Sequence, residues 1–486
     1  MKWLAKILKK GSIIHTQYPP IFLTNTLSGR KEVFVPQKPG IVLLYSCGPT
    51  VYARTHIGNL RTFVFADTIA RTLAAAGYRV HRVINITDVG HLVGDGDFGE
   101  DKVAVSAARE HLTPETIANR YTKLFLEDLD DLSVDTSDIQ FPRATKYIKE
   151  QIALAKTLEE KGFAYRLTDG LYFDTGKFPG YGKLGGLSSE ELEAGARVRV
   201  VKGKRHPADF VLWRTAKPND LQQWNSPWGR GNPGWHIECS AMVRALLGQE
   251  IDIHTGGEDL AHIHHNNEIA QSESVGGRTF VHYWMHSAFL TMRGEKASKS
   301  LGNVVYLSDI VEKGFHPLSL RYFFFQAQYR TPLSFSWDAL AGAAGALDRL
   351  WKMSRVIARE SKRKSAASAI RDQFLATMRD DLATPQALGI LWSVLKSEEY
   401  APEEKWGLLE DAQAHLGLSL LDPPQQSNPL EEKDVPKEIW DLLTRREAAR
   451  ASKDFKKADH IRDAIEHSGY RVDDGPDGPV LTQETL

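Results

Sequence analysis

The fold is decided by the stretch from Ile41 to Ile86, which reads IVLLYSCGPTVYARTHIGNLRTFVFADTIARTLAAAGYRVHRVINI. It opens with a continuous apolar run at residues 41–45, which is typical of a strand buried on both faces. The breaker cluster Cys47-Gly48-Pro49 ends this strand. Apolar residues then recur at helical spacing over residues 59–75, and Gly77 follows as a candidate C-cap.

A second strand is predicted over residues 79–86, so the stretch forms a strand–helix–strand unit. Such a unit requires a parallel sheet with a right-handed crossover, and ligands of these sheets bind at the carboxyl ends of the strands. We therefore expect an α/β fold with a site where Cys47 follows the first strand. Outside this stretch the pattern predicts strands at 210–213, 250–254 and 279–284, and helices at 114–162, from about 340 onward and at 439–466.

Composition narrows the class of protein only slightly. A chain of 486 residues favours two to four domains. Its 61 basic and 62 acidic side chains give a net charge of −1, so any RNA contact must rest on local patches. Two cysteines argue against a disulfide-stapled fold, and no apolar run reaches the roughly 18–20 residues of a membrane helix. The basic residues 1–10 lack the apolar core of a signal peptide, so we expect no membrane partner and a reducing, cytoplasmic location.

Two segments carry residues suited to a polyphosphate. His56-Ile57-Gly58-Asn59 stands where the predicted helix begins, so backbone N–H groups face a ligand that Gly58 allows to approach closely. Lys296-Ala297-Ser298-Lys299-Ser300 offers two mobile positive charges and hydroxyl donors. Taken alone, the first segment is more often an ordinary loop before a helix. For the second segment a solvated surface loop is the less favoured alternative.

Four residues form a candidate metal site. His264 and Glu268 are four apart on a predicted helix and share a face, so both can bind one ion. Together with Cys47 and Cys239 they make an ordinary zinc set of thiolates, imidazole and carboxylate. A single cysteine is more often a small buried apolar residue, but the use of both cysteines with a His-x-x-x-Glu pair favours the metal.

The two polyphosphate segments resemble the His-Ile-Gly-His and Lys-Met-Ser-Lys-Ser signatures of the class I aminoacyl-tRNA synthetases. Asn59 and Ala297 stand where that family has His and Met. The resemblance implies that ATP binds with Mg²⁺ at the residues that match these motifs. The resemblance implies that the ATP-binding residues are His56, Gly58, Asn59, Lys296, Ser298 and Lys299. Of these six, it implies a catalytic role for His56, Asn59, Lys296 and Lys299.

From about residue 24 to 481 the chain resembles the cysteinyl-tRNA synthetases, through Pro233-Gly234-Trp235-His236-Ile237-Glu238-Cys239 among other segments. By this resemblance Zn²⁺ is bound by Cys47, Cys239, His264 and Glu268, and the sulfur of the substrate becomes a further ligand. The resemblance further implies substrate-binding roles for Gly48, Thr50, Trp235 and His254. The implied partners are L-cysteine, ATP and tRNA(Cys), and the implied state is a monomer.

The same resemblance implies a domain plan. An N-terminal extension (1–23) precedes a Rossmann-like catalytic domain (24–308) with a connective insertion at about 115–230. A stem-contact region and helical bundle (309–424) and a small anticodon-binding domain (425–486) follow. Because Trp235 is also compatible with a core role, and the basic residues of the last helix with a solvated face, both assignments stay open.

The chain departs from the family after Val89, where Gly90-His91-Leu92 leads into an acidic loop before Asp101-Lys102. We expect this loop near the mouth of the site. His262 is a weaker candidate ligand than His264.

Two other functions remain open: a cysteine-activating ligase of the mycothiol type, which lacks the anticodon domain, and a catalytically silent, zinc-stabilised RNA-binding protein.

Overall fold

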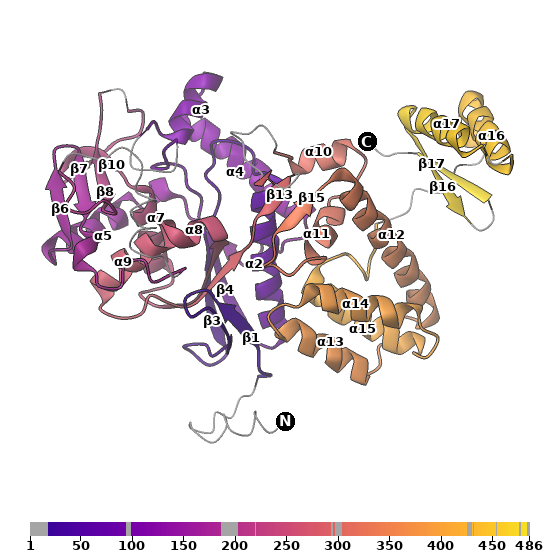
Figure 1. Cartoon of the computed structure of the whole chain (residues 1–486), viewed down its shortest axis with the longest axis horizontal. Helices are drawn as coiled ribbons and strands as arrows, with labels where there is room; N and C mark the ends of the chain where they lie inside the picture. The colour runs from indigo at the N-terminus through magenta and orange to yellow at the C-terminus, as the bar shows by residue number, and fades with distance from the viewer. Residues whose placement is uncertain are drawn as a thin grey trace. The chain divides into compact units, whose positions relative to one another are not determined.

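The computed structural model describes residues 18–93, 99–185, 203–218, 220–292, 295–296, 304–424, 430, 432–452, 454–475 and 478–483 (Figure 1). The chain divides into two compact units. The first comprises Met1–Ile310 and His316–Leu421, and the second comprises Val311–Phe315 and Asp422–Leu486. Within the part of the chain described, no helix combines the length and apolar character needed to cross a membrane.

A five-stranded sheet in the order β12-β11-β3-β4-β5 forms the centre of the first unit, and all its pairings are parallel. Its strands are β3 (Ile41–Ser46), β4 (Arg79–Ile84), β5 (Ile139–Gln140), β11 (Ile251–Gly257) and β12 (Val281–Ser287). Helix α2 (Ile57–Ala75) connects β3 to β4. The predicted α/β fold with a parallel sheet is therefore confirmed.

Helix α2 forms because its sequence meets both cap requirements and buries most of its surface. The side chain of His56 caps its start, and Gly77, with φ +96°, follows its end. Apolar residues of the helix contact apolar residues of the sheet in one core; from α2 these include Phe65, Ile69 and Leu73, and from the strands Val42, Leu44 and Ile253. This contact holds the helix start against the carboxyl end of β3.

The helix predicted over residues 114–162 is wrong in its middle. Helix α4 (Pro114–Asp131) ends before Ser133, which has a positive φ of 54°. The chain then forms β5, which pairs with β4 at the sheet edge, and a short 3₁₀ turn (Ala144–Lys146) before helix α5 (Ile148–Glu160). Tertiary pairing at the sheet edge thus overrides a locally helical pattern.

A second sheet, antiparallel in all its pairings, follows α5 in the order β6-β7-β8-β10-β9. Its strands are β6 (Ala164–Leu167), β7 (Gly170–Phe173), β8 (Phe210–Thr215), β9 (Trp224–Ser226) and β10 (Gly229–Pro233), with a 3₁₀ turn at Thr175–Lys177. Helices α7 (Trp235–Leu246) and α5 share a hydrophobic core with this sheet. The chain therefore leaves the parallel sheet and returns to it through α7.

Helices dominate the rest of the first unit (Figure 1). They are α3 (Lys102–Glu110), α8 (Glu258–His262), α9 (His264–Gly276), α10 (Leu307–Glu312), α11 (Leu318–Phe325), α12 (Trp337–Glu360), α13 (Ala369–Arg379), α14 (Thr384–Lys396) and α15 (Pro402–Leu416). Smaller sheets are formed by β1 (Phe22–Asn25) with β2 (Arg30–Val33), and by β14 (Glu295–Lys296), β13 (Leu290–Met292) and β15 (Leu333–Phe335).

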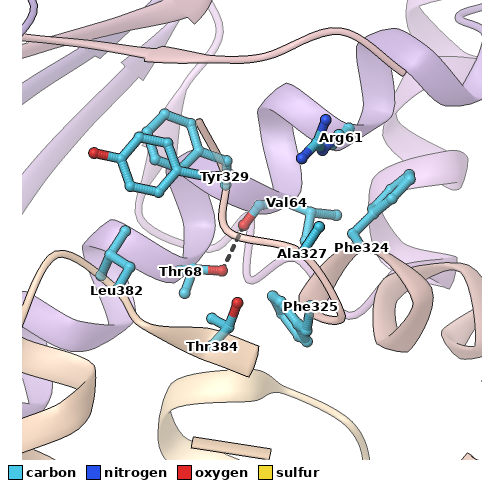
Figure 2. Close-up of a pocket in the computed structure, with 10 residues that line it drawn as sticks. Arg61, Val64, Thr68, Phe324, Phe325, Ala327, Tyr329, Leu382 and Thr384 are labelled. Atoms are coloured by element: carbon cyan, nitrogen blue, oxygen red, sulfur yellow. Dashed lines mark hydrogen bonds between the residues drawn. The ribbon is translucent and has the colours of Figure 1, made fainter. Parts of the chain in front are cut away.

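A small cavity of about 20 Å³ marks the contact between α2 and the helical region. Figure 2 shows Arg61, Val64 and Thr68 of α2 on one side and Phe324, Phe325 and Tyr329 around the hollow. The Thr68 hydroxyl donates to the carbonyl of Val64 at 2.7 Å, so its polar group is satisfied within α2. The space is about the size of one water molecule, which makes it a packing feature and not a substrate site.

The second unit contains α16 (Lys437–Ala451), α17 (Phe455–His467), a 3₁₀ turn (Glu432–Asp434) and the antiparallel pair β16 (Tyr470–Gly475) and β17 (Gly478–Gln483). The single charged helix predicted at 439–466 is two helices, because Asp454 starts a new one by accepting from the backbone N–H of Lys457. Ile439, Ile465 and Leu481 belong to a separate small core.

Candidate active site

The candidate site lies where β3 and β11 end and where α7 and α9 run beside them. Cys47 directly follows β3, and Cys239 lies on α7. His264 and Glu268 lie on the first turns of α9. All four side chains are buried, and both cysteines are free.

The ligand atoms of Cys47, Cys239, His264 and Glu268 all lie within 4.8 Å of one another. The two Sγ atoms are 3.9 Å apart, and Nε2 of His264 is 3.1 Å from Oε1 of Glu268. Two sulfurs bound at about 2.3 Å to one tetrahedral zinc are about 3.8 Å apart. The spacing of the two sulfurs therefore fits a metal ion, and the donor set is typical of zinc.

The electrostatics of this cluster favour the ionised forms of Cys239 and Glu268 but not that of Cys47. Burial alone would raise the pKa of the Cys239 thiol, but hydrogen bonds from Cys47 and His264 lower it to about 6. Burial would likewise raise the pKa of Glu268, but His254 and His264 lower it to about 2. Burial and the adjacent Cys239 raise the pKa of Cys47, so without a cation the two thiols do not both ionise.

A second possible ligand group overlaps the first and consists of Cys47, His254, His265 and Glu268. Nε2 of His254 is 3.0 Å from Oε2 of Glu268, and Nε2 of His265 is 3.4 Å from Sγ of Cys47. His254 lies on β11, is fully buried, and is absent from the residues that line the adjoining pocket. His265 was not among the predicted ligands, although it stands three residues before Glu268 and thus on the same helix face.

Further histidines orient the candidate ligands. His236 and His264 are joined through their Nδ1 atoms at 2.9 Å, and Nδ1 of His265 is 2.8 Å from Nε2 of His286. Burial lowers the pKa of His286 to about 3, which keeps this ring neutral. Partners of this kind fix ring orientation in metal sites. His262 is exposed and belongs to neither possible ligand group.

A pocket of about 460 Å³ opens beside the cluster. It brings together six of the ten residues predicted for ATP and substrate, which are Gly48, Thr50, His56, Gly58, Asn59 and Trp235. Cys47 of the candidate metal site lines it too. His91 and Lys102 line it as well. The sequence around His91 and Lys102 contains no motif that predicts a role for them. They reach the pocket only through the tertiary fold.

The start of α2 faces this pocket through His56, Gly58 and Asn59. The backbone N–H of Ile57 donates to the carbonyl of Val305 at 2.9 Å, and that of Asn59 donates to the carbonyl of His56 at 3.0 Å. Within the part of the chain described, the N–H of Gly58 stays available to another acceptor. Helix starts of this kind attract anions. The predicted location for phosphate binding is therefore at the wall of the pocket, close to Cys47.

The lysine segment is only partly described. The backbone of Lys296 lies in β14 and pairs with Thr291 of β13, whose neighbour Leu290 lines the pocket. Ser298 and Lys299 lie outside the described residues, so their roles stay predictions.

Comparison with known proteins identifies the family. A family model described as the tRNA synthetases class I (C) catalytic domain matches residues 33–345. The cysteine–tRNA ligase of Treponema denticola is 40% identical over 481 residues, which cover 93% of this chain and 97% of the relative. Cysteine–tRNA ligase 1 of Burkholderia lata is 43% identical over 466 residues, covering 95% of this chain and 97% of that protein.

Solved structures agree on the fold. Methionyl-tRNA synthetase of Mycobacterium tuberculosis in complex with methionyl-adenylate gives a TM-score of 0.54 at 17% identity, covering 78% of this chain and 92% of that one. The ternary complex of Agrobacterium radiobacter K84 agnB2 LeuRS with tRNA and LeuAMS gives 0.55 at 11% identity, covering 81% and 86%. At these identities the likeness concerns the fold alone. The family model and the full-length relatives show that this chain belongs to the cysteine–tRNA ligases, a family of class I aminoacyl-tRNA synthetases.

Proposed function

We propose that this protein is an ATP-dependent, AMP-forming cysteine–tRNA ligase. It activates L-cysteine with ATP to cysteinyl-adenylate and transfers the cysteine to the 3′ end of tRNA(Cys). The observation that carries this proposal is the adjacency of two features. A buried cluster of two cysteines, a histidine and a glutamate opens beside a pocket that also contains the His56–Asn59 helix start.

Zinc is the ion that we assign to Cys47, Cys239, His264 and Glu268. When bound, it supplies a soft Lewis-acid site that takes a thiolate in preference to an alcohol. Such a site is needed because serine and cysteine differ by one atom, and packing alone discriminates near-isosteres by roughly 1–3 kcal/mol. The donor set supports this choice, since two thiols within one buried cluster match zinc better than a hard cation.

In this proposal the pocket residues hold the reactants for attack by the cysteine carboxylate on the α-phosphate of ATP. Gly48, Thr50 and Trp235 bind the amino acid, and His254 holds Glu268 in place through its 3.0 Å contact. Gly58 admits the phosphates closely. His56, Asn59 and the N–H groups of α2 stabilise the charge that develops on the phosphate oxygens as pyrophosphate leaves.

Lys296, Ser298 and Lys299 complete the ATP site in this proposal, and Mg²⁺ accompanies the nucleotide. The lysines neutralise the departing pyrophosphate. A hydroxyl of the terminal adenosine of tRNA then attacks the carbonyl carbon of cysteinyl-adenylate. An ester bond forms to the tRNA, the bond from the carbonyl carbon to the phosphate oxygen breaks, and AMP leaves. We assign residues 425–486 to anticodon binding, 309–424 to contact with the tRNA stem, and the protein to the cytoplasm as a monomer.

The two other functions open from the sequence are not favoured. A ligase of the mycothiol type lacks the terminal domain, whereas this chain aligns with 97% of the Treponema denticola and Burkholderia lata cysteine–tRNA ligases. A silent, zinc-stabilised RNA-binding protein needs the ligand cluster but has no need of an ATP-type helix start at the adjoining pocket.

The test is ATP–pyrophosphate exchange on protein whose zinc has been quantified, with cysteine and with serine, followed by charging of tRNA(Cys). We expect about one zinc per chain, exchange with cysteine that exceeds exchange with serine at least a thousandfold, and tRNA charging. Exchange without charging favours the small-amine ligase. Absence of exchange with either amino acid on zinc-loaded protein refutes the proposed activity.

A further inference from the structure

Three side chains at the pocket form a hydrogen-bonded series: Lys102, His91 and Thr50. Nζ of Lys102 lies 2.9 Å from Nε2 of His91, and Nδ1 of His91 lies 2.5 Å from Oγ1 of Thr50. All three residues line the pocket, and His91 is only 8% exposed.

The backbone holds this series together. His91 and Lys102 stand at the two ends of the acidic loop, and the backbone N–H of Lys102 donates to the carbonyl of His91 at 2.9 Å. The carboxylate of Asp101 caps α3 by accepting from Val103 at 2.9 Å and Ala104 at 3.0 Å. These backbone contacts therefore place His91 beside Lys102 at a defined position.

Donor chemistry sets the direction of each bond. An ammonium group has donors only, so Lys102 donates and Nε2 of His91 accepts. A neutral imidazole that accepts at Nε2 carries its proton on Nδ1, which then donates to Oγ1 of Thr50. Among the residues that the structure describes, Oγ1 of Thr50 makes no second hydrogen bond. Its hydroxyl proton is thus left for an acceptor in the pocket.

The series is adjacent to the candidate metal centre. The ring of His91 stacks on that of Trp235, with centroids 3.8 Å apart and planes 9° from parallel. Trp235 in turn lies 4.4 Å from the ring of His264. Cys47 of the cluster and Thr50, three residues further on, both line the pocket. A cysteine whose sulfur is held at the cluster keeps its carboxylate carbon only three covalent bonds away, so its anionic oxygens lie in the same pocket as Thr50.

We propose that His91 is a positioning residue for amino-acid binding. Held in one tautomer by Lys102, it directs the Thr50 hydroxyl to donate to the carboxylate of the substrate cysteine. The ammonium of Lys102 adds a positive charge on the same side of the pocket. This inference rests on the proposed function, because it takes cysteine as the occupant.

Two variants at one position separate hydrogen bonding from packing. His91→Phe keeps an aromatic ring against Trp235 but removes both hydrogen bonds, whereas His91→Asn keeps an N–H donor near the position of Nδ1. In cysteine-dependent ATP–pyrophosphate exchange we expect His91→Phe to raise the KM for cysteine about ten- to a hundredfold. The KM for ATP and the zinc content should stay within twofold of the parent, and His91→Asn should recover most of the loss.

A double-mutant cycle tests the coupling to Thr50. Thr50→Val should raise the KM for cysteine alone, and adding His91→Phe should raise it little further, because both changes remove the same donor. Independent evidence comes from ¹⁵N NMR of histidine-labelled protein, assigned by its difference from His91→Asn. It should show a protonated Nδ1 and an unprotonated Nε2 for His91.

Four outcomes overturn the inference: an unchanged KM in His91→Phe, equal impairment of the Phe and Asn variants, additive effects with Thr50→Val, or the opposite tautomer. Each is measured against the unsubstituted protein. If that protein itself shows no cysteine-dependent exchange, the proposed function fails instead, so the two failures are distinguishable.

Discussion

The carboxylate of Asp67 and the guanidinium of Arg321 form an ion pair of 2.6 Å in which neither side chain is exposed. Asp67 lies on α2 and Arg321 on α11, so the pair connects the helix that starts at the pocket to the helical region. Arg321 also donates to the carbonyls of Leu132 at 2.8 Å and Leu416 at 2.6 Å. One buried side chain thus joins three separate parts of the first unit.

We therefore predict that Arg321→Met destabilises the protein by about 3–5 kcal/mol, because it leaves the Asp67 carboxylate buried without its main partner. Lys31→Met is a suitable control, since it breaks the exposed ion pair with Asp380 and should cost less than about 1 kcal/mol. Denaturant unfolding of the two variants, followed by circular dichroism, measures the difference. Equal unfolding midpoints would contradict the prediction.

The same pair predicts a pH dependence of stability. Burial alone would raise the pKa of Asp67, but Arg321, Arg71 and Arg82 together hold it below its ordinary value. Because the folded state binds this proton less tightly than the unfolded state, the stabilisation is complete above the ordinary aspartate pKa of about 3.9. It is lost as the pH falls through the lower folded-state pKa. Unfolding midpoints measured from neutral to acid pH should fall less steeply in Asp67→Asn than in the parent.

At the metal centre, Cys239→Ser should abolish stoichiometric zinc binding and cysteine-dependent exchange together. The loss of metal affinity should exceed the roughly 10- to 100-fold effect of removing a residue that only orients a ligand. Ser274→Ala, on the same helix as His264 but outside both possible ligand groups, should keep its zinc. Metal analysis after extensive dialysis checks this, and a zinc-replete Cys239→Ser protein would remove Cys239 from the ligand set.

Removal of the metal should also lower the thermal stability. An ion that binds only the folded state stabilises it by RT ln(1 + c/Kd), where c is the concentration of free ion, so chelation should reduce Tm and zinc should restore it. Differential scanning calorimetry with and without chelator measures this shift. The Cys239→Ser protein serves as the control, because its Tm should not respond to either treatment.

Gly48 should tolerate no side chain. A Cβ there would lie 1.6 Å from the carbonyl oxygen of Asn85, so the end of β3 would have to move away from the chain that follows β4. We predict that Gly48→Ala lowers stability by about 1–3 kcal/mol or more and impairs cysteine activation. Gly342→Ala, where a Cβ on α12 meets nothing within 4 Å, should instead stabilise by about 0.4–1 kcal/mol. The opposite signs should be visible in unfolding midpoints.

Sequence patterns were sufficient to predict those features of the structure that depend on neighbouring residues in the chain. The apolar run before Cys47 and the helical periodicity after Asn59 predicted β3, α2 and the parallel sheet, because strand and helix periods are set by neighbouring residues. The spacing of His264 and Glu268 predicted that both share one face of α9, and the structure brings their ligand atoms to 3.1 Å.

Only the tertiary structure decided the rest. The edge strand β5 forms inside a helical pattern because β4 offers an unpaired edge. His265 and His254 lie as close to Glu268 and Cys47 as the predicted ligands do, and His91 contacts Thr50 at the pocket. The Asp67–Arg321 pair spans 254 residues. The physical reason is that sequence periodicity determines on which face of its own helix or strand a side chain lies. Chain topology and packing determine which other helix or strand that face contacts.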